Sequence, residues 1–199
     1  MSEPLRKPPR SALTVRDMLV AMGILVVVVG LIGGVTRGCS FSPGGPSVDQ
    51  GALPVVDAPA ELRRLAPLVP FALRVPAVPP GWRSNSADQD LVAPADPALG
   101  RAVRVGYLTP QGRYLRLLQS DATEEALLAS ETGGAPVPAG GTTDVGGLRF
   151  VVYGGPDDEP IWIGELDGVR VLITGSGGEP DFQALAGAVV GGERLPTGR

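Results

Sequence analysis

The sequence predicts an α+β protein in which an N-terminal transmembrane helix precedes one outer domain. That domain is expected to contain an antiparallel sheet of about five to seven strands with a C-terminal helix packed on it. Three observations predict this class: an apolar run over residues 18–35, successive hairpins of alternating residues between 101 and 174, and an apolar stripe near the C-terminus. Consecutive hairpins with few helices are typical of the α+β class.

Residues 18–35 contain no charged side chain and predict a single membrane span. As a helix the run is about 27 Å long, close to the ~30 Å hydrocarbon core of a bilayer. Four basic residues precede the run, whereas only Arg37 follows it closely. Because positive residues near a span stay on the cytoplasmic side, we expect a plasma-membrane protein with residues 1–17 as a cytoplasmic arm and the C-terminal domain outside.

Cys39, the single cysteine, lies just after the apolar run. The Gly38-Cys39 pair resembles a lipoprotein signal, in which the cysteine is acylated. However, Thr36 and Arg37 stand where such a signal has an apolar and a small residue. No A-x-A cleavage site follows the run, so we expect an uncleaved signal-anchor. Cys39 then stays free, forms a disulfide with a second chain, or is acylated.

Residues 36–57 are rich in Pro, Gly and Ser, which predicts a flexible linker before a domain over residues 58–195. Asp57 is placed to cap a helix over residues 58–66, and a short strand is expected over residues 71–75. The domain therefore begins with one helix and one strand.

The stretch 84–100 is polar and rich in turn residues, and it predicts a long loop with a strand near Trp82. A capping-box-like start at Asp121 predicts a helix over residues 122–131, which Gly133 and Gly134 end. This helix separates the first hairpin of the domain from the later ones.

The first hairpin covers residues 101–120, with Thr109-Pro110-Gln111-Gly112 between two alternating runs. A two-residue loop would place Arg116 on the apolar face. A type I turn with a left-handed Gly112 and a G1 bulge moves the register by one residue, which exchanges the faces. Arg104 and Arg116 then share one face, and we expect this register. The opposite, buried face would hold Val103, Val105, Tyr107, Leu115 and Leu117.

Two further hairpins are expected, with strands over 142–145 and 148–153 and over 161–166 and 169–174. Asp167-Gly168 joins the last pair and is the strongest short hairpin signal in the chain. Both faces of this last pair carry apolar residues, which indicates central strands. Pro180 opens the C-terminal helix, and its apolar stripe consists of Phe182, Leu185, Ala186, Val189 and Val190.

The composition excludes several classes of function. Beyond residue 37 the chain has 12 arginines against 19 carboxylates, a net charge of about −7, which argues against nucleic acid as a partner. There is no histidine, and Lys7 on the N-terminal arm is the only lysine. Ser-His and Ser-Lys chemistry and most zinc sites are thereby excluded. We expect no enzyme, no cofactor and no metal.

Arg104 and Arg116 are the polar pair that the hairpin geometry brings together, and they are the candidate ligand-binding residues. Two neighbouring arginines would suit an anionic wall polymer or an acidic patch on an envelope protein. As exposed charges they should contribute little to stability. The favoured interpretation is a binding or interaction module of the cell envelope. The alternatives are a structural envelope protein and a hydrolase that uses carboxylates alone, which would need two carboxylates in a pocket beside Trp82 or Trp162.

Five separated motifs together resemble the domain-of-unknown-function 4245 family, single-pass membrane proteins of high-GC Gram-positive bacteria. The motifs are RGCSFSPGGP at 37–46, VDAPAELR at 56–63, PPGWRSNS at 79–86, VGYLTPQGRYLRLLQS at 105–120 and LITGSGGEPDF at 172–182. The resemblance implies a short cytoplasmic arm, one span and an outer domain, and it implies no activity.

Overall fold

The computed structural model describes residues 15–36, 54–154 and 159–197, with the side chains of the first range described from residue 16 to residue 29. The chain divides into two units, Met1–Val48 and Asp49–Arg199. In the first unit, helix α1 spans Val15–Thr36 and exposes its apolar side chains from Met18 to Val29. Across the described ranges, no helix combines the length and the apolar character needed to cross a bilayer.

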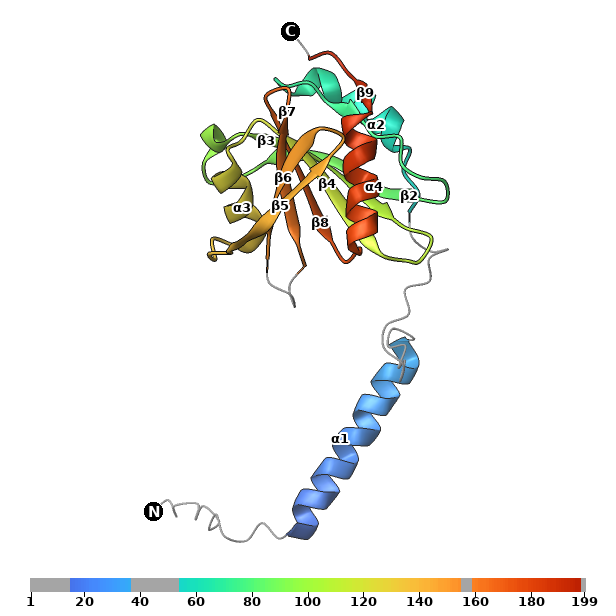
Figure 1. Cartoon of the computed structure of the whole chain (residues 1–199). Coiled ribbons are helices and arrows are strands. Elements are labelled where there is room, and N and C mark those ends of the chain that lie inside the picture. Colours follow the sequence, from blue (N-terminus) through green and yellow to red (C-terminus); the bar gives the residue numbers. More distant parts are fainter. Residues whose placement is uncertain (1–14, 37–53, 155–158, 198–199) are drawn as a thin grey trace, which may run out of the picture. The chain divides into compact units, whose positions relative to one another are not determined.

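The second unit is built on a seven-stranded sheet in which every pair of neighbouring strands is antiparallel (Figure 1). The strand order is β2-β3-β4-β8-β7-β6-β5, and β1 pairs with β9 in a separate ribbon. The main strands are β2 (Arg83–Leu91), β3 (Arg101–Leu108), β4 (Tyr114–Ser120), β5 (Ala139–Val145), β6 (Leu148–Tyr153), β7 (Ile161–Leu166) and β8 (Val169–Gly175). The short elements are β1 (Arg74–Val75), β9 (Glu193–Arg194) and the 3-10 turns η1 (Ala66–Leu68) and η2 (Pro97–Leu99). The α+β class and its antiparallel sheet are confirmed.

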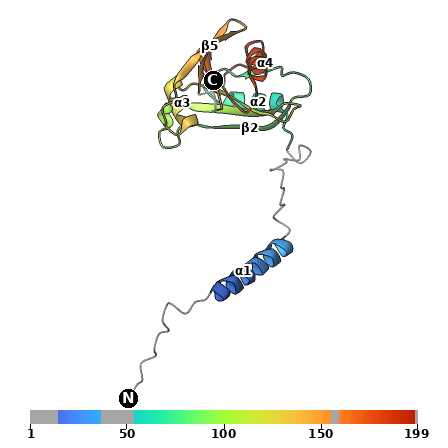
Figure 2. The ribbon, with the colours of Figure 1, turned by 60° about the horizontal axis from the view of Figure 1, so that its bottom comes forward.

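Helices cover both faces of the sheet. On the first face, α2 (Ala58–Leu65) and α4 (Glu179–Val190) bury a core that includes Phe150, Trp162 and Phe182. Helix α4 lies beside β5, as Figure 2 shows, and also contacts β8 and β1. On the second face, α3 (Glu124–Thr132) packs Leu127 into a smaller apolar cluster. The predicted packing of the C-terminal helix on the sheet is therefore confirmed.

The turn between β3 and β4 has the predicted bulged geometry. Gly112 donates its N–H to the carbonyl of Thr109 at 2.9 Å and adopts a left-handed φ of 78°, while Thr109 donates to the carbonyl of Arg113 at 2.9 Å. In the resulting register Tyr107 lies opposite Leu115, and Gly106 lies opposite Arg116. Leu115 and Leu117 are buried in the first-face core, so both arginines of the hairpin belong to the second face.

Three other predicted features also form. Asp167 and Gly168 both have positive φ, 54° and 78°, and connect β7 to β8 with Leu166 opposite Val169. Asp57 accepts a hydrogen bond from the N–H of Ala60 at 3.0 Å and caps α2. The helical stripe of α4 is buried at Phe182, Leu185, Ala186 and Val189, whereas Val190 is half-buried.

A strand forms next to Trp82 as expected, but the predicted loop over residues 84–100 is wrong in extent, because this edge strand, β2, runs over Arg83–Leu91. This strand pairs with β3 from Arg83 opposite Leu108 to Leu91 opposite Arg101, with a bulge between Ser84 and Ser86. Its sequence is polar because it lies at the sheet edge, where polar side chains remain hydrated. Backbone pairing with β3, rather than apolar alternation, holds it in place.

Two element boundaries also differ from the prediction. Thr123, not Asp121, caps α3 by accepting a hydrogen bond from the N–H of Ala126 at 3.2 Å, while Asp121 accepts from the N–H of Arg101 at 2.7 Å. The strand expected over 71–75 contains only Arg74 and Val75, which pair with β9. In both cases the boundary depends on a residue distant in the sequence, because Asp121 binds Arg101 and β1 pairs with β9.

Gln119 joins β1 to the main sheet. Its side chain is buried, with 1 % of the residue exposed, and it accepts a hydrogen bond from the N–H of Arg74 at 2.6 Å. Its amide nitrogen donates to the carbonyl of Arg74 at 2.9 Å. A single side chain thus satisfies both backbone groups of Arg74, as a neighbouring strand would.

Candidate functional site

A row of directly paired residues crosses the second face from one edge strand to β7. Ser86 lies opposite Gly106, Gly106 opposite Arg116, Arg116 opposite Thr174, and Thr174 opposite Ile161. We call this set, Ser86, Gly106, Arg116, Thr174 and Ile161, the Arg116 row.

The neighbouring row of paired residues contains Arg104 and continues with apolar residues. These residues, Leu118, Leu172 and Ile163, belong to the apolar cluster that α3 covers. The Arg116 row is therefore where the second face turns polar.

Both predicted arginines have a carboxylate partner within the domain. Arg116 pairs with Glu131 of α3, whose side chain is only 9 % exposed. Arg104 lies 3.9 Å from the carboxylate of Asp88, directly opposite it on β2. The side chains of Arg104 and Arg116 are 18 % and 33 % exposed, so the expectation of two exposed charges is wrong. The fold uses both residues structurally, and the Arg116–Glu131 pair lines a pocket.

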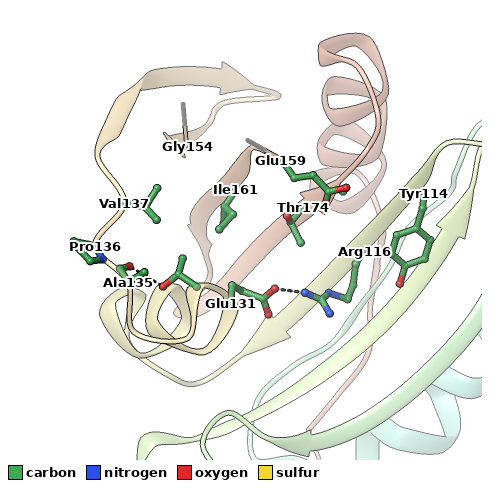
Figure 3. A pocket seen from close by; sticks show the side chains of 12 residues that line it. Tyr114, Arg116, Glu131, Ala135, Pro136, Val137, Gly154, Glu159, Ile161 and Thr174 are labelled. Atoms are coloured by element: carbon green, nitrogen blue, oxygen red, sulfur yellow. Dashed lines mark hydrogen bonds and ion pairs between the residues drawn. The ribbon is translucent and has the colours of Figure 1, made fainter. Parts of the chain in front are cut away.

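That pocket has a volume of about 570 Å³ and lies between α3, the segment that follows it and strands β4, β7 and β8 (Figure 3). Arg116 and Glu131 point toward each other, with Thr174 and Glu159 above them in this view. The segment after α3 supplies an apolar wall of Ala135, Pro136 and Val137, and Ile161 adds a buried apolar side chain. The pocket therefore combines a polar wall with an apolar one.

A second set of polar groups adjoins this pocket through Tyr114. A Cβ atom added to Gly106 would lie 2.5 Å from Asn85 Oδ1, 2.5 Å from Ser86 Oγ and 2.8 Å from the hydroxyl of Tyr114. The bulge in β2 places the Asn85 and Ser86 oxygens over the same residue, which is a known use of bulges. Because Gly106 has no side chain, three neutral oxygen atoms converge next to Arg116.

Helix α3 is fixed beside the pocket by a bond to β6. The hydroxyl of Tyr153 donates to Oε1 of Glu124 at 2.5 Å. The pKa of Tyr153 is raised to about 12, mainly by this hydrogen bond and to a smaller extent by burial. The phenol therefore remains protonated at neutral pH, and the bond holds the helix that carries Glu131.

Other residues singled out in the sequence lie elsewhere. Ser176 accepts a hydrogen bond from the N–H of Tyr114 at 3.1 Å, so it joins the β8–α4 turn to β4. Arg113 pairs with Asp181 at 2.9 Å. Neither Trp82 nor Trp162 lines the Arg116 pocket. Cys39 lies outside the described residues.

The residues that complete the site were not predicted from the sequence. Tyr114 was detectable, because it lies two positions before Arg116 in a strand and therefore on the same face. Glu131 lies in the last turn of α3, but its pairing with Arg116 depends on how the helix docks. Asn85 and Ser86 fell in the stretch expected to be a loop. Asn85 and Ser86 could have been predicted as site residues only if this polar stretch had been recognised as an edge strand.

The fold and the site define an α+β domain of antiparallel hairpins with a mixed polar and apolar surface pocket. The chain belongs to the family described as "Protein of unknown function (DUF4245)", whose model matches residues 10–189. The resemblance noted in the sequence is thus confirmed. No match was found among curated proteins or solved structures.

Proposed function

We propose that this chain is a membrane-anchored, extracytoplasmic binding module of the cell envelope, with the Arg116 pocket as its binding site. In this proposal residues 1–17 are a cytoplasmic arm, 18–35 cross the plasma membrane, 36–57 act as a linker, and 58–195 bind a component of the envelope. The observation that carries it is a pocket of about 570 Å³ on the second face of the sheet, a volume within the range of ligand sites.

The anchor is supported by sequence and by the helix that forms there. The apolar run 18–35 lies within α1, which exposes apolar side chains along its described length. The structure describes the side chains of this helix only from residue 16 to residue 29, so this exposure concerns residues 18–29 of the run. Basic residues before the run favour a cytoplasmic N-terminus. Cys39, next to the proposed span, remains a predicted site of acylation or of a disulfide between chains.

Binding is favoured over catalysis by the chemistry of the pocket. Hydrolysis by carboxylates alone needs one group as acid and another as base or nucleophile. Glu131 is instead paired with Arg116 and almost fully covered, and Glu159 is exposed. Within the described ranges, no group of three or more Cys, His, Asp or Glu residues could hold a metal ion. These features suit the positioning of a ligand better than its cleavage.

A reporter fused after Arg199 tests the proposed topology. Alkaline phosphatase, which is active only outside the cytoplasm, should be active in this fusion, because the basic arm retains the N-terminus inside. A fluorescent protein that folds only inside should stay dark at the same position. The opposite pair of results would reverse the orientation and remove the proposed envelope location.

Photo-crosslinking in intact cells tests the binding site. A benzophenone side chain at Ala135, an exposed residue of the pocket wall, should give a discrete adduct with an envelope component after irradiation. The matched control is Ala60, which is also an exposed alanine and lies in α2, on the other face of the sheet. If Ala135 gives no adduct, or if both positions give the same adducts, the Arg116 pocket is not the binding site.

A further inference from the structure

The glycine at position 106, over which side chains crowd, is a feature of the second face that backbone geometry does not explain. Gly106 does not have the positive φ that favours glycine. A Cβ atom there would instead meet three side-chain oxygens within 2.8 Å. Glycine at this position therefore serves to let Asn85, Ser86 and Tyr114 converge. Neutral polar groups drawn together beside a pocket are typical of a site that orients a ligand.

The charges of this surface disfavour an anionic ligand. Arg116 is neutralised by Glu131, and Glu159 adds a further negative charge to the pocket. Arg104 likewise has Asp88 as its neighbour. A polyanion would have to compete with these carboxylates for both arginines. The sequence-based expectation of an anionic wall polymer is therefore not the one that this surface favours.

The remaining groups suit a ligand rich in hydroxyl groups. Ser86 Oγ donates to Asn85 Oδ1 at 3.4 Å, which leaves the Asn85 amide nitrogen to donate and the Ser86 oxygen to accept. The hydroxyls of Tyr114 and Thr174 can each donate and accept a hydrogen bond. A sugar offers the complementary set of donors and acceptors around its ring. Its C–H face also needs an apolar surface, which Ile161 and the wall from Ala135 to Val137 provide.

We infer that the ligand of this site is an uncharged glycan, whose hydroxyl groups bind to the polar side chains that converge at Gly106 and to the polar wall, while its C–H faces pack on the apolar wall. This inference rests on the proposed function, since it names the ligand class of the same pocket. Asn85, Ser86, Tyr114 and Thr174 are the residues that recognise the glycan. The Arg116–Glu131 pair borders the ligand as a neutral unit.

Gly106→Ala is the decisive variant. The added Cβ would displace oxygens at the ends of flexible side chains rather than backbone atoms, so the fold should be retained while the convergence is lost. The matched control is Gly140→Ala, also in a strand, where the new Cβ would make ordinary contacts at 3.6 Å and 3.7 Å. Both variants should keep the circular dichroism spectrum of the unsubstituted chain.

The test uses the full-length chain in nanodiscs of uncharged lipid, titrated with a panel of neutral hexose and pentose oligosaccharides. Oligogalacturonate of similar length serves as the acidic probe. At least one neutral oligosaccharide should bind, and oligogalacturonate should bind about tenfold more weakly or not at all. Gly106→Ala and Tyr114→Phe should each weaken the neutral ligand about tenfold, and Gly140→Ala should not.

Each other result overturns the inference. If no neutral oligosaccharide binds, or if Gly106→Ala binds as well as Gly140→Ala, the site is not a glycan site. If oligogalacturonate binds more tightly and Gly106→Ala weakens it, the pocket binds acidic polymers instead, and the proposed binding module stands without this ligand class. Failure of the proposed function itself would show separately, as the absence of an Ala135 adduct in cells.

Discussion

Arg116→Glu should lower the melting temperature of the domain by about 5–10 °C, corresponding to about 2–3 kcal/mol. The substitution places a second carboxylate against Glu131, whose side chain is 9 % exposed and therefore poorly hydrated. Breaking a buried ion pair costs more than this, but the side chain of Arg116 is one-third exposed, and solvent screens part of the repulsion. Thermal denaturation followed by circular dichroism measures the change.

Two further variants separate this effect from general intolerance of substitution. Arg116→Glu combined with Glu131→Arg restores opposite charges at the two positions and should recover more than half of the lost stability. Arg149→Glu is the matched control, because Arg149 pairs with Asp144 at the surface, where both side chains are more than half exposed. It should change the melting temperature by less than about 2 °C. If Arg149→Glu lowers the melting temperature as much as Arg116→Glu does, the partly buried Arg116–Glu131 pair has no special role in stability.

Gln119→Leu should destabilise the domain by about 2–3 kcal/mol, because leucine fills a similar volume and the main loss is of the two hydrogen bonds to Arg74. The N–H and the carbonyl of Arg74 would then be left without partners in a part-buried position. Each unsatisfied group costs about 1–3 kcal/mol, offset by the apolar side chain. Urea denaturation measures the free energy of unfolding, with an unchanged m-value expected.

Gln183→Leu is the control for this substitution. Gln183 lies exposed on α4, where its amide donates to Glu179 at 3.1 Å. Its replacement should change the free energy of unfolding by less than about 0.5 kcal/mol. If both substitutions lower the free energy of unfolding equally, the hydrogen bonds from Gln119 to β1 make no specific contribution to stability.

The hairpins were predictable because their signals are local. A left-handed Gly112 after Pro110 fixes the register of β3 and β4, and Asp167-Gly168 fixes that of β7 and β8. Once the register is known, alternation assigns each side chain to a face. For this reason the amino-acid order of the hairpin is enough to place Arg104 and Arg116 on a shared face.

The partners of those arginines could not be predicted in the same way. Glu131 reaches Arg116 only because α3 docks on the second face, and Asp88 faces Arg104 only because a polar stretch is an edge strand. Gln119 likewise bonds to Arg74, which is 45 residues away in the chain. Long-range docking leaves no periodic pattern in the sequence, so the charge balance of the site emerged from the fold alone.

The pairing of β4 with β8 has a consequence for how the chain folds. Ser120 and Arg170 are neighbours in the sheet although they are fifty positions apart, so the β3–β4 hairpin gains its second neighbour only when β8 exists. Closing such long loops is slow compared with forming a hairpin. The chain is synthesised from its N-terminus, so the hairpins that form early keep apolar surface exposed to solvent until β8 and α4 have been synthesised. We expect acquisition of the native state to follow the emergence of β8 and α4, and truncation before Val169 to leave an aggregation-prone intermediate.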